Sequence, residues 1–481
     1  MTFTRRLVSG TAQLALSNGV VRLLSIVTMP ILTTLLSPQA YGLATLLGTI
    51  ISLVSVLALA GIDVTYARVY HSVQPPNGPV VEHFCWRFAI CMALTGVLLA
   101  AIVWFIARYF VELDYRLAII LLLGIVLSVT CKMAQTRARI GSKYRAMALT
   151  TIAAGLIGAV VSLGIAFWWR QDAVALLLPM LCAYLIPLLL LGAPSVAELM
   201  KPSGLVRGQG ATLIKIGLAG IVTAPMYWML SSSDRWFLQY YHGTVAVGIY
   251  GIGYNVAVVG MMVNVAVISM WLPEASREYE QDRERAKYTL GRLMSRLLAA
   301  MALIWLMAAA AGGDIVRWLA DERFHGSAEF VPFIAGGVFF YGASQLAVYG
   351  LVLVKEYKWA AYWWFGGGLF CALLNYALVP RYSGLGAAIT QSASFAVISI
   401  GIFCTSQVKY RIQLDWSRLV TVTSIILVAG LFLALPWHVT APLSLLMKLP
   451  FGIAVASMTA WVIAPDWCVR GKEYVIKTRT E

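Results

Sequence analysis

Long apolar runs dominate this chain of 481 residues and restrict its fold more than any other feature. Each run is about 20 residues long, the length of a helix that crosses a hydrocarbon core about 30 Å thick. Inside a bilayer every backbone N–H and C=O needs a partner within the protein, so only helices or closed barrels can span it. Barrel strands would be about half as long and would alternate polar and apolar residues. The runs therefore predict an all-α polytopic membrane protein.

About fourteen transmembrane helices are predicted from these runs. The two least regular ones contain Pro225 and the glycines at 366–368. Such interruptions are tolerated in membranes and are common in the working helices of transporters. The predicted spans are 12–36, 42–63, 86–107, 116–133, 147–169, 173–192, 212–238, 245–271, 292–311, 330–354, 360–379, 385–406, 418–436 and 443–464.

The charges fit a membrane protein better than a nucleic-acid-binding one. Only 12% of residues are charged, about half the share of a soluble domain. The net charge is +15, but 27 of the 36 Lys and Arg residues fall on one side of the predicted spans and 8 on the other, with Arg22 inside a span. Basic loops stay in the cytoplasm. We therefore expect both termini there and no nucleic-acid partner.

Cysteine and histidine spacing indicates no metal site and no disulfide framework. The seven cysteines include no CxxC pair, and the five histidines lack the spacing of zinc ligands. No cofactor is expected from the residues, although coupling to protons or sodium ions stays open.

Two short segments recur at an offset of 209 residues. Residues 41–44 (Tyr-Gly-Leu-Ala) recur as 250–253 (Tyr-Gly-Ile-Gly), and 67–70 align with 276–279. This repeat would place the first six spans on the next six in the same orientation, as in carriers with two related halves. The predicted organisation is two six-helix bundles around a central cavity, with a cytoplasmic linker and two further helices: 1–192, 193–211, 212–408 and 409–481.

Four segments also carry a family resemblance, in order and with matching spacing. They are 30–42 at the join of the first two spans, 61–68 at the end of the second, 233–250 at the join of the seventh and eighth, and 375–388 between the eleventh and twelfth. Over roughly residues 11–410 the chain resembles the polysaccharide and O-antigen flippases of the multidrug/oligosaccharidyl-lipid/polysaccharide (MOP) exporter superfamily.

This resemblance implies a transporter and not an enzyme. It implies that undecaprenyl-pyrophosphate-linked oligosaccharide repeat units move from the inner to the outer leaflet by alternating access, for O-antigen or exopolysaccharide assembly. The implied location is the bacterial inner membrane. The implied partners are the lipid-linked glycan, membrane lipids, and the polymerase and chain-length proteins of the same pathway.

Three other functions remain open. Two belong to the same superfamily, a lipid II flippase and a multidrug or cation antiporter. An antiporter would place carboxylates inside its spans, whereas this chain has Arg22 there, which favours an anionic substrate. A membrane glycosyltransferase or polymerase would need catalytic carboxylates on an outer loop, and the only candidates are Asp314, Asp321 and Glu322.

Arg22 is the leading substrate-binding candidate because a charge within a span is costly unless it faces water or a partner. Asn18 and Ser25 lie four residues before it and three after it, so the three share one helix face. Arginine can bind a pyrophosphate group through two parallel hydrogen bonds. We therefore expect this stripe to face a wet cavity.

Further candidates lie near the ends of the spans. Arg68 and Arg277, which the repeat aligns, and Lys215 at the start of the seventh span are expected to attract an anionic headgroup. The candidates for gating or ion coupling are Asp63, Asp234, Arg235 and Glu274. Asp234 and its neighbour Arg235 are expected to point in different directions at the outer end of a span, each with its own partner. Residues 274–287 are expected to form a surface helix.

Overall fold

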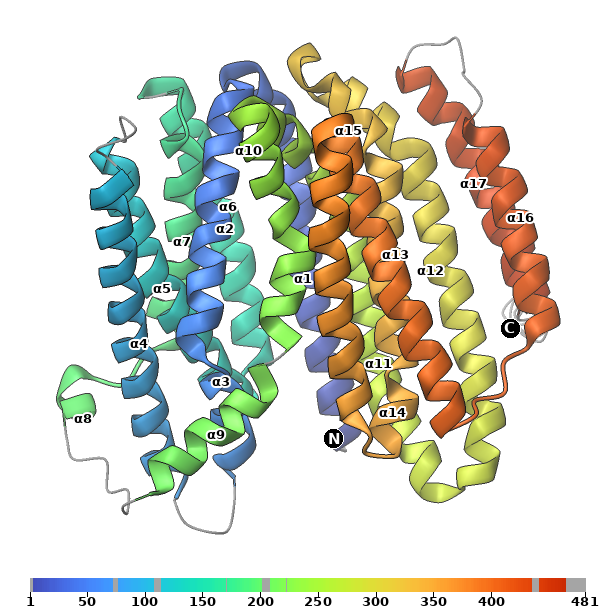
Figure 1. The fold of residues 1–481 in the computed structure, drawn as a ribbon, viewed down its shortest axis with the longest axis horizontal. Helices are drawn as coiled ribbons and strands as arrows, with labels where there is room; N and C mark the ends of the chain where they lie inside the picture. The colour runs from blue at the N-terminus through green and yellow to red at the C-terminus, as the bar shows by residue number, and fades with distance from the viewer. Residues whose placement is uncertain are drawn as a thin grey trace, which may run out of the picture. The chain divides into compact units, whose positions relative to one another are not determined.

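The computed structural model describes residues 3–71, 77–107, 114–169, 171–200, 208–221, 223–434 and 441–463. Every regular element in these ranges is an α-helix or a short 3₁₀ helix (Figure 1), as the apolar runs predict. The chain divides into two units, Met1–Gly251 and Ile252–Glu481. The finer division into bundles at residues 192, 211 and 408 stays a prediction.

In the first unit, long helices pack side by side. Helix α1 packs against α6, α6 against α7, and α5 against α2, α4 and α7 (Figure 1). The elements are α1 (Phe3–Leu35), α2 (Pro38–Leu59), α3 (Ile62–Val69), α4 (Gly78–Ala107), α5 (Tyr115–Ile140), α6 (Tyr144–Trp168), α7 (Val174–Leu191), α8 (Val196–Met200), α9 (Gln209–Ile221) and most of α10 (Thr223–Ala257).

In the second unit, α12 is the helix on which most others pack. It contacts α11, α13, α16 and α17, while α13 also packs along α15. The elements are η1 (Val258–Gly260), α11 (Met261–Gln281), α12 (Arg283–Leu319), η2 (Glu322–Glu329), α13 (Val331–Ala347), α14 (Tyr349–Leu353), α15 (Tyr357–Lys409), α16 (Trp416–Ala434) and α17 (Ala441–Ile463).

Local chemistry explains where the helices break. The Ser37 side chain accepts a hydrogen bond from the Ala40 amide and caps α2, which begins at Pro38. Gly243, with φ 78°, interrupts α10, and Ser383, with φ 48°, interrupts α15. Both breaks fall between spans that the sequence separates. Eleven helices in the described ranges are long and apolar enough to cross a membrane, and the total of about fourteen stays a prediction.

The predicted span 212–238 covers part of α9 and the start of α10, and its continuity stays a prediction. One sequence expectation about helices is wrong. Residues 274–287 do not form a separate surface helix. Instead α11 ends at Gln281, and the Asp282 carboxylate caps α12 by accepting from the amides of Glu284 and Arg285. Both helices thus continue beyond the apolar region into charged segments, which meet at Asp282.

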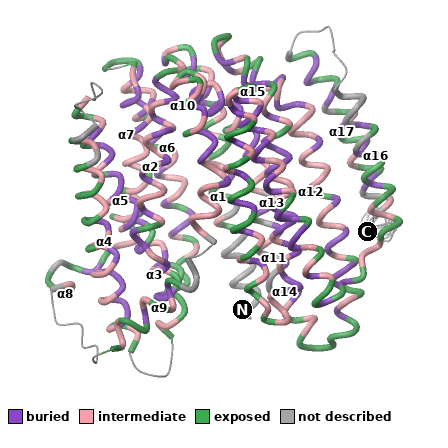
Figure 2. The backbone as a smooth tube through the Cα atoms, viewed as in Figure 1, coloured by how far each residue is buried: buried purple, intermediate pink, exposed green. Residues whose placement is uncertain are grey.

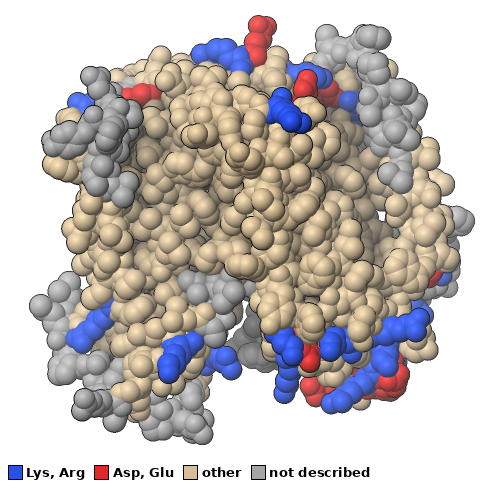
Figure 3. Space-filling model, in the orientation of Figure 1, with Lys and Arg blue, Asp and Glu red and all other residues tan. Residues whose placement is uncertain are grey.

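The distribution of side chains is that of a protein surrounded by lipid. In each unit, charged side chains gather near the helix ends and leave an uncharged middle (Figure 3). Buried and exposed residues alternate along most helices (Figure 2). Large apolar side chains such as Leu16, Val160 and Leu189 are about 70% exposed on those outer faces. Apolar surface on this scale is unfavourable in water and ordinary in a bilayer.

Candidate functional site

The predicted polar stripe lies on the exposed side of α1. Asn18, Arg22 and Ser25 are all exposed, whereas Ser17 and neighbouring positions are buried where α1 packs on α6. The Ser25 hydroxyl donates to the Arg22 carbonyl at 2.7 Å, so its proton is used within the helix. Among the described residues, Arg22 forms no ion pair with a carboxylate. Its guanidinium can therefore accept an anionic ligand, and binding itself stays a prediction.

Asp63, Arg68 and Lys215 lie on two short helices that pack together. The Thr65 hydroxyl of α3 donates to the Leu213 carbonyl of α9 at 3.1 Å, and the two backbones approach each other at glycines. Asp63 is half-buried, and Arg68 and Lys215 are exposed. Lys215 thus lies on α9, and its place at the start of the seventh span stays a prediction.

The expectation that Asp234 and Arg235 point in different directions is wrong. Both residues are buried, with 1% and 5% of their surface exposed. They also contact each other, since Arg235 Nη1 lies 3.4 Å from Asp234 Oδ1. The long arginine side chain reaches back along its own helix and also donates to the Ser231 carbonyl at 2.6 Å. Beyond the break at Gly243, the Tyr250 hydroxyl donates to Asp234 Oδ2 at 2.5 Å. The cluster is therefore a buried polar network.

The two remaining candidates lie on α11. Arg277 is exposed near the end of this helix. The side chain of Glu274 lies outside the described residues. Whether Arg277 acts together with Arg68 stays a prediction.

Two of the three outer-loop carboxylates, Asp314 and Asp321, pair with basic side chains. Asp314 lies on α12, where Lys448 Nζ is 2.6 Å from Asp314 Oδ2 and the Ser444 hydroxyl donates to the same atom at 2.8 Å. Asp321 caps η2 and pairs with Arg323 at 2.7 Å. The hydrogen bond from Arg323 holds the pKa of the Asp321 carboxyl below its usual value. Both acids thus have structural partners.

Sequence reasoning did not connect Asp314 with Lys448. Both charges lie next to apolar runs, and two such charges of opposite sign could have indicated a partnership. Sequence reasoning also missed four buried polar residues on the two arms of α15. Asn375, Thr390, Gln391 and Ser394 are buried, and each has a side-chain oxygen without a hydrogen-bond partner in the described structure.

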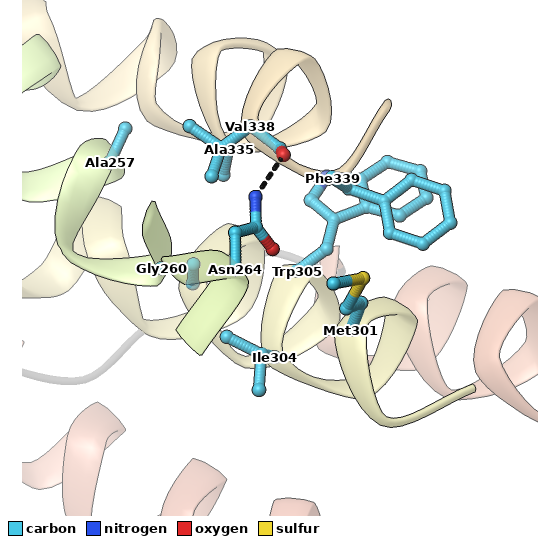
Figure 4. Close-up of a pocket in the computed structure, with 10 residues that line it drawn as sticks. Ala257, Gly260, Asn264, Met301, Ile304, Trp305, Ala335, Val338 and Phe339 are labelled. Carbon is cyan, nitrogen blue, oxygen red and sulfur yellow. Dashed lines mark hydrogen bonds between the residues drawn. The ribbon is translucent and has the colours of Figure 1, made fainter. Parts of the chain in front are cut away.

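A small void in the second unit is a packing feature. It lies between α11, α12 and α13, where the Asn264 amide donates to the Val338 carbonyl at 2.6 Å beside Trp305 (Figure 4). Its volume of about 10 Å³ holds at most one water molecule. It is far too small for a glycan.

The start of α2 and the part of α10 after its break are in very close contact. Gly42 lies against the Thr244 carbonyl, and Gly248 lies against the Pro38 carbonyl. Each glycine is needed because a Cβ atom would overlap the opposite backbone. Adding 206 to positions 38 and 42 gives 244 and 248, so the two contacts are reciprocal. This spacing is three residues less than the offset of 209 in the sequence, and the repeat itself stays a prediction.

Comparisons with known proteins agree with this fold. A family model described as polysaccharide biosynthesis protein matches residues 31–325. Among solved structures, lipid II flippase MurJ in an inward closed conformation shows 12% identity and a TM-score of 0.71, over 95% of this chain and 99% of that one. No curated protein sequence matches the chain significantly.

Two transporters of the MOP superfamily are also similar in structure. One, of the multidrug resistance MATE family in an inward-facing conformation, gives a TM-score of 0.55 at 11% identity, over 87% of this chain and 99% of that one. The other, from Pyrococcus furiosus, gives 0.56 at 13% identity, over 88% and 99%. At such identities the similarity shows the fold alone. Because the family model covers more than half of the chain, the protein belongs to the polysaccharide biosynthesis protein family, on a fold of the MOP superfamily.

Proposed function

We propose that this protein is a flippase that moves undecaprenyl-pyrophosphate-linked oligosaccharide repeat units from the inner to the outer leaflet. The main support is the match of residues 31–325 to polysaccharide biosynthesis proteins on a flippase-like fold. The exposed polar stripe of α1 adds a cation within a predicted span. The repeat units would serve O-antigen or exopolysaccharide assembly at the bacterial inner membrane.

In this mechanism the cations bind the diphosphate and the glycines form the outer closure. Arg68, Arg277 and Lys215, all exposed, attract the anionic headgroup at the cytoplasmic side. Arg22 then binds the diphosphate through two parallel hydrogen bonds. Asp63 and Glu274 neutralise the capture cations when the inner side closes. The contact of α2 with α10 at Gly42 and Gly248 must open for release.

Purified protein in liposomes tests this function. A fluorescent oligosaccharide on undecaprenyl pyrophosphate, placed in one leaflet, should become accessible to a quencher added to the other side. Liposomes without protein, and liposomes with the Arg22→Ala variant, are the controls. Transfer of sugar to an acceptor with no change of leaflet would contradict the proposal and favour a glycosyltransferase.

A lipid II flippase is the second candidate, because the TM-score to a lipid II flippase is 0.71. Lipid II also carries a polyprenyl pyrophosphate, so Arg22 could bind either headgroup. The same liposome assay with both substrates separates the candidates. We expect faster flipping of the repeat unit, since the family match is to polysaccharide biosynthesis proteins. Faster flipping of lipid II would reverse the assignment.

A further inference from the structure

Three arginines line one face of the first half of α12. Arg285, Arg292 and Arg296 follow one another at spacings of seven and four residues, which places them on one side of a helix. Together they border a groove of about 450 Å³, whose remaining walls are Tyr288, Thr289 and Leu293.

These arginines have no acidic partner among the described residues. The nearby carboxylate of Glu284 pairs with Lys287 at 2.6 Å, on another face of the helix. The Nε atom of Arg296 is buried and has no hydrogen-bond acceptor in the described structure. A buried cationic donor without an acceptor is costly. The groove therefore offers three cations and one unsatisfied N–H to an anionic ligand.

The position of the groove along α12 indicates which anion fits. Arg296 directly precedes the uncharged run 297–311, so it lies at the boundary of the apolar region. Arg292 is about 6 Å and Arg285 about 16 Å further from that region, at 1.5 Å per residue. The same face continues at Ala299 and Leu306, which pack against α16 and α17. The column of arginines thus starts at the level of lipid headgroups.

We propose that this groove binds the phosphate or diphosphate group of a membrane-anchored lipid. A guanidinium binds phosphate oxygens in pairs, and basic residues clustered on a helix at the membrane surface attract anionic headgroups. Leu293 and Tyr288 supply apolar contacts that a free inorganic anion would not use. The site requires only a bound lipid and is independent of the proposed transport.

Topology alone does not explain the arrangement. A topology signal depends on which side of the membrane a charge occupies, and not on the face of the helix. Arg283 shows the difference, because it does not line the groove and lies over the ring of Tyr279, with 5.2 Å to its centroid. It has the same charge on the same helix, which makes Arg283→Gln the matched control.

The test compares three forms of the full chain in nanodiscs: wild type, the double variant Arg292→Gln with Arg296→Gln, and Arg283→Gln. Binding of farnesyl diphosphate, a short lipid diphosphate, should weaken about tenfold or more in the double variant, since hydrogen bonds to charged groups are lost. Arg283→Gln should change it less than about twofold. A double Lys variant, which keeps the charge, should bind with intermediate affinity.

Two further probes separate the sources of the phosphate. Nanodiscs of phosphatidylglycerol should raise the Tm of the wild type above its value in phosphatidylcholine, and the double variant should lose this rise if bulk anionic lipid occupies the groove. If the double variant loses affinity for farnesyl diphosphate but keeps the rise in Tm, the ligand is a polyprenyl diphosphate. The proposal is overturned if the double variant retains both responses, or if inorganic pyrophosphate binds as tightly as farnesyl diphosphate.

Discussion

Asp314 and Arg22 are both charges on long apolar helices, but their surroundings differ. Asp314 is 7% exposed, and Lys448 and Ser444 of α17 contact the same carboxylate oxygen. Arg22 is exposed and forms no ion pair within the described ranges. A charge in a membrane helix is therefore not by itself a sign of function. Burial and a partner make it structural, and exposure without a partner leaves it available to a ligand.

Asp234 shows that a structural partner can also be local. Its cation is the next residue in the chain, and Tyr250 closes the network from across the break at Gly243. Asp314 instead depends on a lysine 134 residues away. Loss of Lys448 leaves Asp314 with Ser444 and with Arg317, which is half exposed and 4.0 Å away. Loss of Tyr250 leaves Asp234 with the buried Arg235 at 3.4 Å, so the loss of a partner should cost more at Asp314.

The largest effect is expected for Lys448→Met. This variant leaves Asp314 buried without its close cation and should destabilise the fold by about 3–5 kcal/mol. Thermal unfolding of the purified protein in nanodiscs would show a clear fall in Tm. The double variant Asp314→Leu with Lys448→Met removes both charges and should recover most of the loss. An unchanged Tm in Lys448→Met would show that the pair contributes nothing to stability.

A smaller effect is expected for Tyr250→Phe. The variant removes one hydrogen bond to the Asp234 carboxylate while Arg235 keeps its charge compensated, so the loss should be about 1.5–3 kcal/mol. The same unfolding assay measures it. Tyr240→Phe is a suitable control because the Tyr240 side chain is 81% exposed. A loss of stability larger than that of Lys448→Met would contradict the expectation that the long-range partner matters more than the local one.

Arg22→Ala should leave the Tm nearly unchanged, because the side chain is exposed and has no ion pair to lose. Export of the glycan should be abolished if Arg22 binds the diphosphate. Arg22→Lys should keep part of the export, since an ammonium retains the attraction without the bidentate geometry. Cell-surface polysaccharide is measured beside the amount of protein in the membrane. Normal export by Arg22→Ala would remove Arg22 from the proposed mechanism.

The smallest effect is expected for Arg68→Gln combined with Arg277→Gln. Both side chains are exposed, so stability should not change. If they capture substrate, the concentration for half-maximal flipping in liposomes should rise, while the maximal rate stays the same. Residues that only set topology are redundant among 27 basic residues on their side. A wild-type concentration dependence in the double variant would assign them to topology.

The sequence was sufficient to predict the helical class, whereas α1, α4, α11 and α12 extend about eight to ten residues beyond the predicted spans. The bilayer sets the length of each span by its thickness and favours cytoplasmic loops that are rich in Lys and Arg. Both signals can therefore be read from the sequence span by span. Ser37 caps α2 and Pro38 is the first residue of that helix. Both lie between the first two predicted spans, so the start of α2 could be predicted locally. The error at 274–287 occurred where polar residues continue a helix beyond the apolar region, since hydropathy does not register such extensions.

The sequence by itself determined that Asn18, Arg22 and Ser25 share a face, because helical periodicity alone sets that relation. Only the tertiary structure decided which charges have partners. Lys448 and Asp314 meet because α17 packs on α12, and no local rule connects residues so far apart. The groove of Arg285, Arg292 and Arg296 has periodic spacing in the sequence, but packing decided that Arg296 Nε is buried without an acceptor. Burial is a property of neighbouring helices, and the sequence of one helix does not contain it.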